Sequence, residues 1–144
     1  MRVEKQATTS ASAERTFEYL ADLTKHPDWS SHGLKISQSS PGAIGVGTTF
    51  TTEAHQFGKQ SDTVTITELV PGRRIVFETK GKAGAVRHWF EVTPSSAGTT
   101  ITKGMELVKP SFASRLASPG IRLNVPRMLA KDLERIKSRL ESSV

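Results

Sequence analysis

Residues 124–140 read NVPRMLAKDLERIKSRL, and this stretch decides the fold because it closes a chain that otherwise consists mainly of strands. Its apolar residues recur at intervals of four, four, three and four positions, the spacing of one face of an α-helix. They are Val125, Leu129, Leu133, Ile136 and Leu140. We expect a helix capped by Asn124, with Pro126 in its first turn. Such a helix needs an apolar surface to pack against.

The segment before this helix predicts an interruption. Pro110 and the Pro119-Gly120 pair break the helical pattern, so we expect a separate short helix at Phe112–Ala117.

Two further helical segments are predicted near the N-terminus. Ala13–Leu23 places apolar residues on one helical face, and Ser12 is a suitable N-cap. A second helical turn is expected around His26–Ser30, with Pro27 at its first position. The apolar residues of the first segment are Phe17, Leu20 and Ala21.

Between the first and last helices, the sequence is rich in Thr, Val, Ile and aromatic residues, which favours β-strands. Short connections containing Gly and Pro predict antiparallel neighbours and an α+β fold of about seven strands. The expected strands are Met1–Thr9, Leu34–Ser39, Thr48–His55, Thr63–Leu69, Arg74–Thr79, Val86–Thr93 and Thr99–Val108.

Alternation within these strands reveals two polar residues on faces otherwise suited to burial. In Val86–Val92 the even positions form the apolar face but include His88, while Arg87, Trp89 and Glu91 face outward. In the last strand, Lys103 shares its face with Ile101, Met105 and Leu107.

These two residues allow different interpretations. His88 is either a core histidine that is satisfied by a neighbour, or a polar anchor in a cavity that orients a ligand oxygen or moves a proton. Lys103 is expected near a strand end, with its ammonium reaching water, or outside after a bulge.

Composition limits the classes of function. The chain has 144 residues and no cysteine, which excludes disulfides and thiolate catalysis. A single domain spanning residues 1–144 is expected from this length. No apolar run is long enough to span a bilayer, and the polar N-terminus does not resemble a secretory signal, so we expect a cytoplasmic protein.

Positive charge is concentrated at the C-terminal end. Eight basic and three acidic residues from Lys109 onward contribute +5 to a net charge of +6. We interpret them as the solvated face of the last helix, because the basic residues are interleaved with acidic ones. A surface that binds anionic lipid or nucleic acid is the alternative.

Known catalytic and cofactor motifs are absent from the sequence. It contains no GxxxxGK[ST], GxGxxG, HExxH or GxSxG pattern. We therefore expect no metal and no cofactor, and no catalytic constellation is recognisable.

Several strings together resemble the START/Bet v 1-like (SRPBCC) superfamily, in particular its polyketide cyclase/dehydrase and lipid-transport branch. These strings are ATTSASAERTFEYLAD, HPDWSS with Trp29, GVGTTF, TELVPGRRIVFE, RHWFEVTP and GTTITKGMEL, and they span almost the whole chain in the order typical of that superfamily.

The resemblance implies a helix-grip fold, in which a curved antiparallel sheet wraps around the long C-terminal helix and a hydrophobic cavity lies between them. We expect the cavity to bind a lipid, a sterol or a polyketide-like molecule. The alternative is a polyketide cyclase or dehydratase that uses His88 as its acid or base. The expected ligand-binding residues are Trp29, Phe50, Phe77, His88, Phe90, Met105, Leu129 and Leu133, and most of them are first expected to be core residues.

Overall fold

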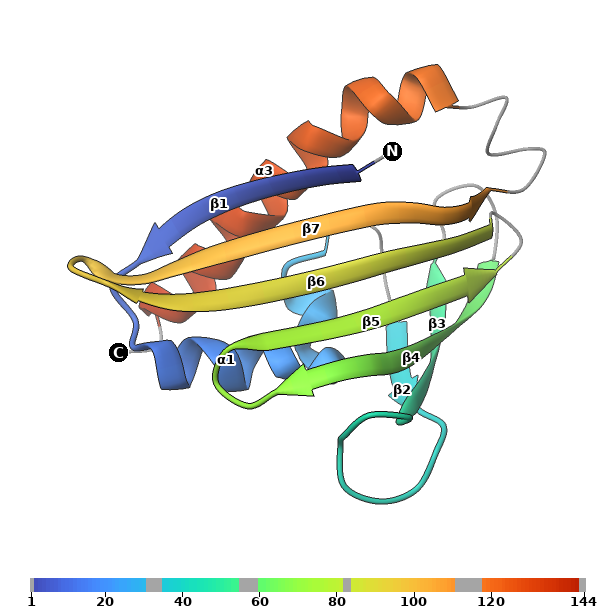
Figure 1. Cartoon of the computed structure of the whole chain (residues 1–144), viewed down its shortest axis with the longest axis horizontal. Coiled ribbons are helices and arrows are strands. Elements are labelled where there is room, and N and C mark those ends of the chain that lie inside the picture. Colours follow the sequence, from blue (N-terminus) through green and yellow to red (C-terminus); the bar gives the residue numbers. More distant parts are fainter. Residues whose placement is uncertain (1, 31–34, 55–59, 82–83, 111–117, 143–144) are drawn as a thin grey trace.

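Seven strands form one curved antiparallel sheet in the computed structural model, which describes residues 2–30, 35–54, 60–81, 84–110 and 118–142 (Figure 1). The strand order is β1-β7-β6-β5-β4-β3-β2, so each strand from β2 to β7 pairs with its neighbour in sequence and β1 closes onto β7. The strands are β1 (Arg2–Thr9), β2 (Lys35–Gln38), β3 (Thr49–Ala54), β4 (Gln60–Val70), β5 (Arg74–Gly81), β6 (Gly84–Ser95) and β7 (Gly98–Pro110). The predicted α+β class and strand number are confirmed.

The central strands are longer than the sequence predicted. β6 and β7 each extend to the tight turn at residues 96–97. Gly98 allows this turn because its φ is +129°, a value that residues with a Cβ rarely adopt. A Cβ at Gly98 would also overlap the carbonyl oxygen of Thr9 and crowd the backbone of Ser10. The turn therefore packs directly against the end of β1.

Two short helical elements follow β1, as predicted. In α1 (Ala13–Ala21) the Ser12 hydroxyl accepts a hydrogen bond of 3.2 Å from the backbone N–H of Arg15, which confirms the N-cap. The 3₁₀ helix η1 (Leu23–Asp28) begins earlier than expected, because the Asp22 carboxylate accepts from the backbone N–H of Thr24. Pro27 accordingly lies inside this element and not at its start.

The C-terminal helix α3 (Ser118–Ser142) starts six residues before the predicted cap at Asn124. The predicted start was wrong because Pro119 falls in the first turn, where the missing N–H has no helical partner to lose. Pro126 lies inside the helix, where it removes one backbone hydrogen bond without ending the element. The short helix predicted at Phe112–Ala117 lies outside the described residues. All five residues of the predicted apolar stripe are buried.

The helices cover the concave face of the sheet. α3 packs along β1 and also contacts β7 and η1, while α1 contacts β6 and β7 (Figure 1). One cluster of buried residues joins the helices to the sheet. It includes Phe17, Leu20, Trp29, Phe50, Ile66, Ile75, Phe77, Phe90, Val92, Ile101, Leu133, Ile136 and Leu140.

On the convex face, Trp89 points outward as predicted but is only 2% exposed. It lies over Gly104 of the neighbouring strand, which leaves room for the indole because a Cβ there would overlap the ring. The Trp89 indole N–H donates to Glu4 at 3.2 Å, and the Arg2 guanidinium lies 4.6 Å from the ring centroid. An outward-facing position is therefore buried by its strand neighbours alone.

Candidate functional site

Lys103 lies in the middle of β7 on the concave face, and only 5% of its surface is exposed. Its cross-strand neighbour on β6 is Phe90, and the pairing runs without a register shift through this position. The expectation that its ammonium reaches water was wrong, because β7 continues well beyond this residue in both directions. No bulge turns the side chain outward at this position.

Two aromatic rings flank the Lys103 ammonium. Its Nζ lies 5.3 Å from the centroid of the Trp29 ring and 5.3 Å from that of the Phe90 ring. Both distances are within the ~6 Å at which the face of an aromatic ring attracts a cation. The two rings meet edge to face, with centroids 5.8 Å apart. They replace part of the hydration that the ammonium loses on burial.

Asp132 provides a negative charge near Lys103. It is 5% exposed and projects from α3, and its Oδ1 lies 3.5 Å from a guanidinium nitrogen of Arg135. Burial lowers the pKa of Lys103 from 10.5 to about 8, and the attraction of Asp132 partly opposes that shift. An ammonium and a free amine are therefore both accessible near neutral pH at this position.

His26, from η1, packs against the same aromatic groups. Its Nε2–H donates a hydrogen bond of 3.0 Å to the carbonyl oxygen of Leu20, because a carbonyl oxygen can only accept. Its ring centroid is 4.7 Å from that of Trp29 and 5.5 Å from that of Phe77. Burial lowers its pKa to about 4, and the nearby charge of Lys103 adds to this shift. His26 is neutral at pH 7.

His88 lies on the concave face of β6 and stacks on Phe77, with ring centroids 5.1 Å apart and planes 15° apart. Burial lowers its pKa to about 3, with further contributions from Lys103 and His26. By exposed area, however, His88 is only half-buried. Protein atoms thus crowd the imidazole on most sides while part of its surface stays accessible.

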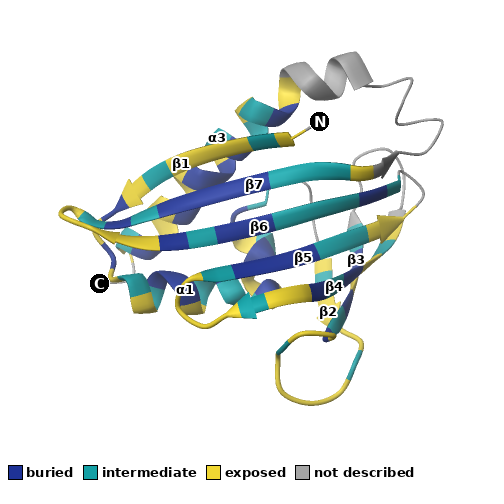
Figure 2. Ribbon diagram, in the orientation of Figure 1, coloured by how far each residue is buried: buried dark blue, intermediate teal, exposed yellow. Residues whose placement is uncertain are grey.

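Burial along the concave face is uneven. At the level of Val92 and Ile101 the inward side chains are almost fully buried. Toward the start of β6 and the end of β7, inward side chains retain accessible surface, and Figure 2 shows these stretches of the strands largely in teal. They are Val86, His88, Met105 and Leu107.

The predicted ligand-binding residues fall into three groups. Trp29, Phe50, Phe77, Phe90 and Leu133 belong to the buried cluster that joins the helices to the sheet. His88 and Met105 are cross-strand neighbours and half-buried. Leu129 is fully buried on α3 but lies outside that cluster.

Sequence reasoning missed His26 and Asp132 and placed Lys103 incorrectly. A signal for Asp132 was present, because it stands three residues after Leu129 and directly before Leu133, at the edge of the apolar stripe. For His26 the sequence offers only its nearness to Trp29.

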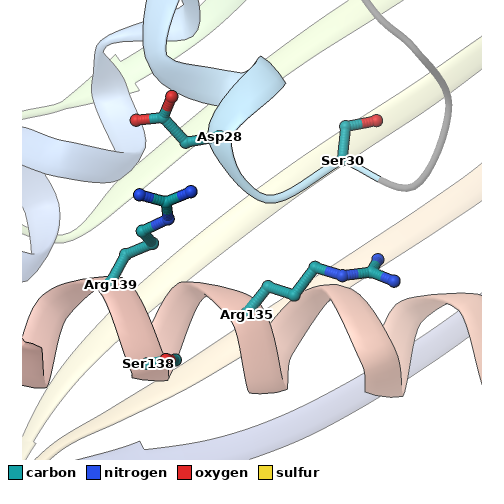
Figure 3. Close-up of a pocket in the computed structure, with 5 residues that line it drawn as sticks. All are labelled: Asp28, Ser30, Arg135, Ser138 and Arg139. Carbon is teal, nitrogen blue, oxygen red and sulfur yellow. The ribbon is translucent and has the colours of Figure 1, made fainter.

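A polar hollow of about 420 Å³ lies between η1 and α3 (Figure 3). It is lined by Asp28, Ser30, Arg135, Ser138 and Arg139. In Figure 3 the Arg139 guanidinium points toward the Asp28 carboxylate, whereas the Arg135 guanidinium points toward the part of the hollow below Ser30. This lining suits polar molecules and not the apolar ligand expected from the sequence.

A second hollow, of about 310 Å³, lies between α1, Ile44 and the end of β4. Its lining is mostly apolar: Phe17, Ala21, Ile44, Leu69 and Pro71, together with Glu18 and Asp22. Neither of these two hollows contains His88 or Lys103 in its lining. The part of the chain that the structure describes contains no group of three His, Asp or Glu side chains able to hold a metal ion. None of its helices is long and apolar enough to cross a membrane.

Comparisons with known proteins agree with this architecture. The family model described as polyketide cyclase/dehydrase and lipid transport matches residues 1–141. The chain belongs to this family. The resemblance inferred from the sequence is thereby confirmed, as is the helix-grip fold. A search of curated proteins found no match.

Solved structures with a similar fold have low sequence identity to the chain. The Zhui aromatase/cyclase from Streptomyces sp. R1128 superimposes with a TM-score of 0.79 at 18% identity, over 98% of this chain and 93% of that one. Protein CV1439 from Chromobacterium violaceum gives 0.69 at 18% identity, over 96% of both chains. Protein NE0264 from Nitrosomonas europaea gives 0.72 at 12% identity, over 99% of this chain and 96% of that one. At these identities the similarity establishes the fold alone.

Proposed function

We propose that this member of the polyketide cyclase/dehydrase and lipid transport family binds a small hydrophobic ligand between the sheet and α3, with an uncharged polar group of the ligand at Lys103. The observation that carries this proposal is a buried ammonium in the middle of a mostly apolar concave face. Burying a charge costs several kcal/mol unless it is well compensated. Such a residue suits a polar anchor better than a packing role.

Electrostatics favours a ligand whose polar group carries no charge. Lys103 and Asp132 already oppose each other in sign, and both nearby histidines are neutral at pH 7. A ligand carboxylate would therefore bring an additional charge into a dry site, at a desolvation cost. A carbonyl or hydroxyl oxygen can accept from the ammonium. The buried Trp29 indole N–H, which has no hydrogen-bond partner in the described part of the chain, is a second available donor.

The apolar part of the ligand would follow the half-buried end of the concave face. His88 supports this placement, because its imidazole keeps some accessible surface although desolvation lowers its pKa. Both properties are expected for a ring at the edge of a partly enclosed space. Val86, Met105 and Leu107 would then provide apolar contact around it.

Native mass spectrometry with a matched ligand series tests this proposal. Nonanol, nonanone and nonanoic acid share one apolar chain and differ at the polar end. We expect the alcohol and the ketone to bind with 1:1 stoichiometry, and the acid more weakly.

Two tryptophan variants on adjacent residues of β7 provide the matched control. Met105→Trp fills the concave side, and Glu106→Trp adds the same ring to the convex side. We expect the first to weaken nonanone binding by about tenfold or more, which corresponds to roughly 1.4 kcal/mol, and the second to leave it unchanged. Equal binding by both variants, or none by the unmodified protein, would contradict the proposal.

A cyclase or dehydratase activity is the second candidate function. It is favoured by the fold shared with the Zhui aromatase/cyclase and by the presence of His88 beside an amine that titrates near neutral pH. In this account His88 moves a proton as a neutral imidazole. His88→Gln should then abolish turnover of an aromatic polyketide analogue while the circular dichroism spectrum stays unchanged; retained turnover would remove His88 from the chemistry.

A further inference from the structure

We propose that Lys103 forms a reversible covalent imine with ligands that carry an aldehyde or ketone, which makes carbonyl compounds the ligand class of the concave site. This inference rests on the proposed function, because it places the ligand's polar end at this residue. It goes further by assigning a chemical reaction to the Lys103 side chain.

The surroundings of Lys103 suit an amine nucleophile. β6 contributes the Phe90 ring, and η1 with the residue after it contributes His26 and the Trp29 ring. α3 contributes the Asp132 carboxylate. Among the lysines whose side chains the structure describes, Lys103 is the buried one. An apolar carbonyl compound that enters this face therefore meets one amine.

The reaction balances without any further reagent. The Lys103 ammonium first gives up a proton, and the free amine then attacks the carbonyl carbon to form a carbon–nitrogen bond. One proton of the attacking nitrogen passes to the former carbonyl oxygen, which gives a neutral carbinolamine. The proton released in the first step then protonates the hydroxyl, which leaves as water and gives a protonated imine. One ammonium and one carbonyl compound thus yield one iminium ion and one water molecule.

The charge of the Lys103 side chain does not change when the ammonium becomes an iminium ion, so the buried Lys103 and Asp132 can support imine formation. The iminium carries the same single positive charge as the ammonium that it replaces. The attraction of Asp132 and the faces of the two aromatic rings therefore act on the product as they act on the resting side chain. No new uncompensated charge is created in the dry site.

The protonation state of Lys103 supports its reactivity. With a pKa of about 8, roughly one side chain in ten is a free amine at pH 7. For an ordinary lysine with a pKa near 10.4, the fraction is roughly one in two to three thousand. Lys103 should accordingly react much faster than exposed lysines.

Reductive trapping tests the inference. The protein is incubated at pH 7 with nonanal and sodium cyanoborohydride, and the modified lysine is identified by peptide mass spectrometry. We expect one equivalent of label, placed on Lys103 at least about tenfold faster than on the exposed lysines Lys25 and Lys131. Label distributed over exposed lysines at similar rates would overturn the inference.

Three controls separate this inference from the proposed function. Lys103→Met should lose the selective label, and Lys137→Met, on the exposed side of α3, should keep it. Lys103→Arg retains the positive charge but cannot form an imine, so it should escape labelling as Lys103→Met does. Nonanol binding by the unmodified protein without selective labelling would refute the imine alone, and absence of nonanol binding would refute the proposed function.

Discussion

The Nζ atom of Lys103 lies 5.3 Å from the centroid of the Trp29 ring. This contact connects the middle of β7 with the residue that follows η1, two segments far apart in sequence. It also places a charged group where sequence alternation predicts burial. Because Asp132 approaches from α3, the same lysine interacts with sheet, short helix and long helix. The site is therefore built from tertiary contacts of all three elements.

Acid should destabilise the protein through His26 and His88, because desolvation lowers the pKa of both imidazoles. The folded-state pKa values of His26 and His88, about 4 and about 3, are lower than their unfolded value of 6.5. Below pH 6.5 the unfolded chain binds protons that the folded chain does not, so the free energy of unfolding falls as the pH drops toward 4. The slope should be about 1.4 kcal/mol per pH unit for each histidine.

Urea denaturation from pH 7 to pH 4 measures this effect. His88→Gln should reduce the slope by about half, since it removes one of the two groups. An unchanged slope in that variant would contradict the lowered pKa of His88.

Alkali should stabilise the folded state through Lys103. Its pKa falls from 10.5 in the unfolded chain to about 8 in the folded one. Between these values the unfolded chain holds the extra proton, so the free energy of unfolding rises with pH, by up to about 1.4 kcal/mol per unit. The difference in unfolding free energy between the native protein and Lys103→Met isolates this contribution. A difference that does not change from pH 8 to pH 10 would show that Lys103 is not desolvated.

Asp132→Asn should destabilise the protein by about 3 kcal/mol at pH 7, because it leaves a buried ammonium without its counter-charge. Arg135→Gln is the matched control on the same helix, since this guanidinium is 45% exposed and should cost less than about 1 kcal/mol. Both values follow from urea denaturation. Equal effects of the two substitutions would place the importance of Asp132 in its contact with Arg135 and not in Lys103.

Gly104→Ala should destabilise the sheet by about 1–3 kcal/mol, because the added Cβ overlaps the Trp89 indole. Gly45→Ala is the control, as a Cβ there meets nothing within 4 Å. Tryptophan fluorescence and urea denaturation report both. If Gly104→Ala were neutral, the close packing of Trp89 on β7 would be wrong.

Most of the fold follows from the spacing of residues in the sequence. The apolar stripe from Val125 to Leu140 predicted both the long helix and its buried face, and local alternation predicted which way His88 points. These features depend on neighbours three, four or two residues apart, which sequence displays directly. The start of α3 was missed because proline is compatible both with a break and with a first turn.

The polar centre of the site was less accessible to sequence reasoning. Lys103 was assigned to a strand end because a lone lysine is usually solvated, and its burial depends on Trp29 and Asp132, which are distant in sequence. The burial of Trp89 on the convex face likewise depends on the absence of a side chain at Gly104. Only the three-dimensional pairing of strands and helices brings these groups together.

The most direct test of the account is the NMR response of Lys103 Nζ and of the Trp29 indole N–H to nonanone. We predict that both resonances shift in a saturable manner with 1:1 stoichiometry, while those of the exposed lysines and of the Trp89 indole stay in place. Saturable binding that leaves Lys103 and Trp29 unperturbed would contradict the placement of the ligand's polar group at the buried lysine.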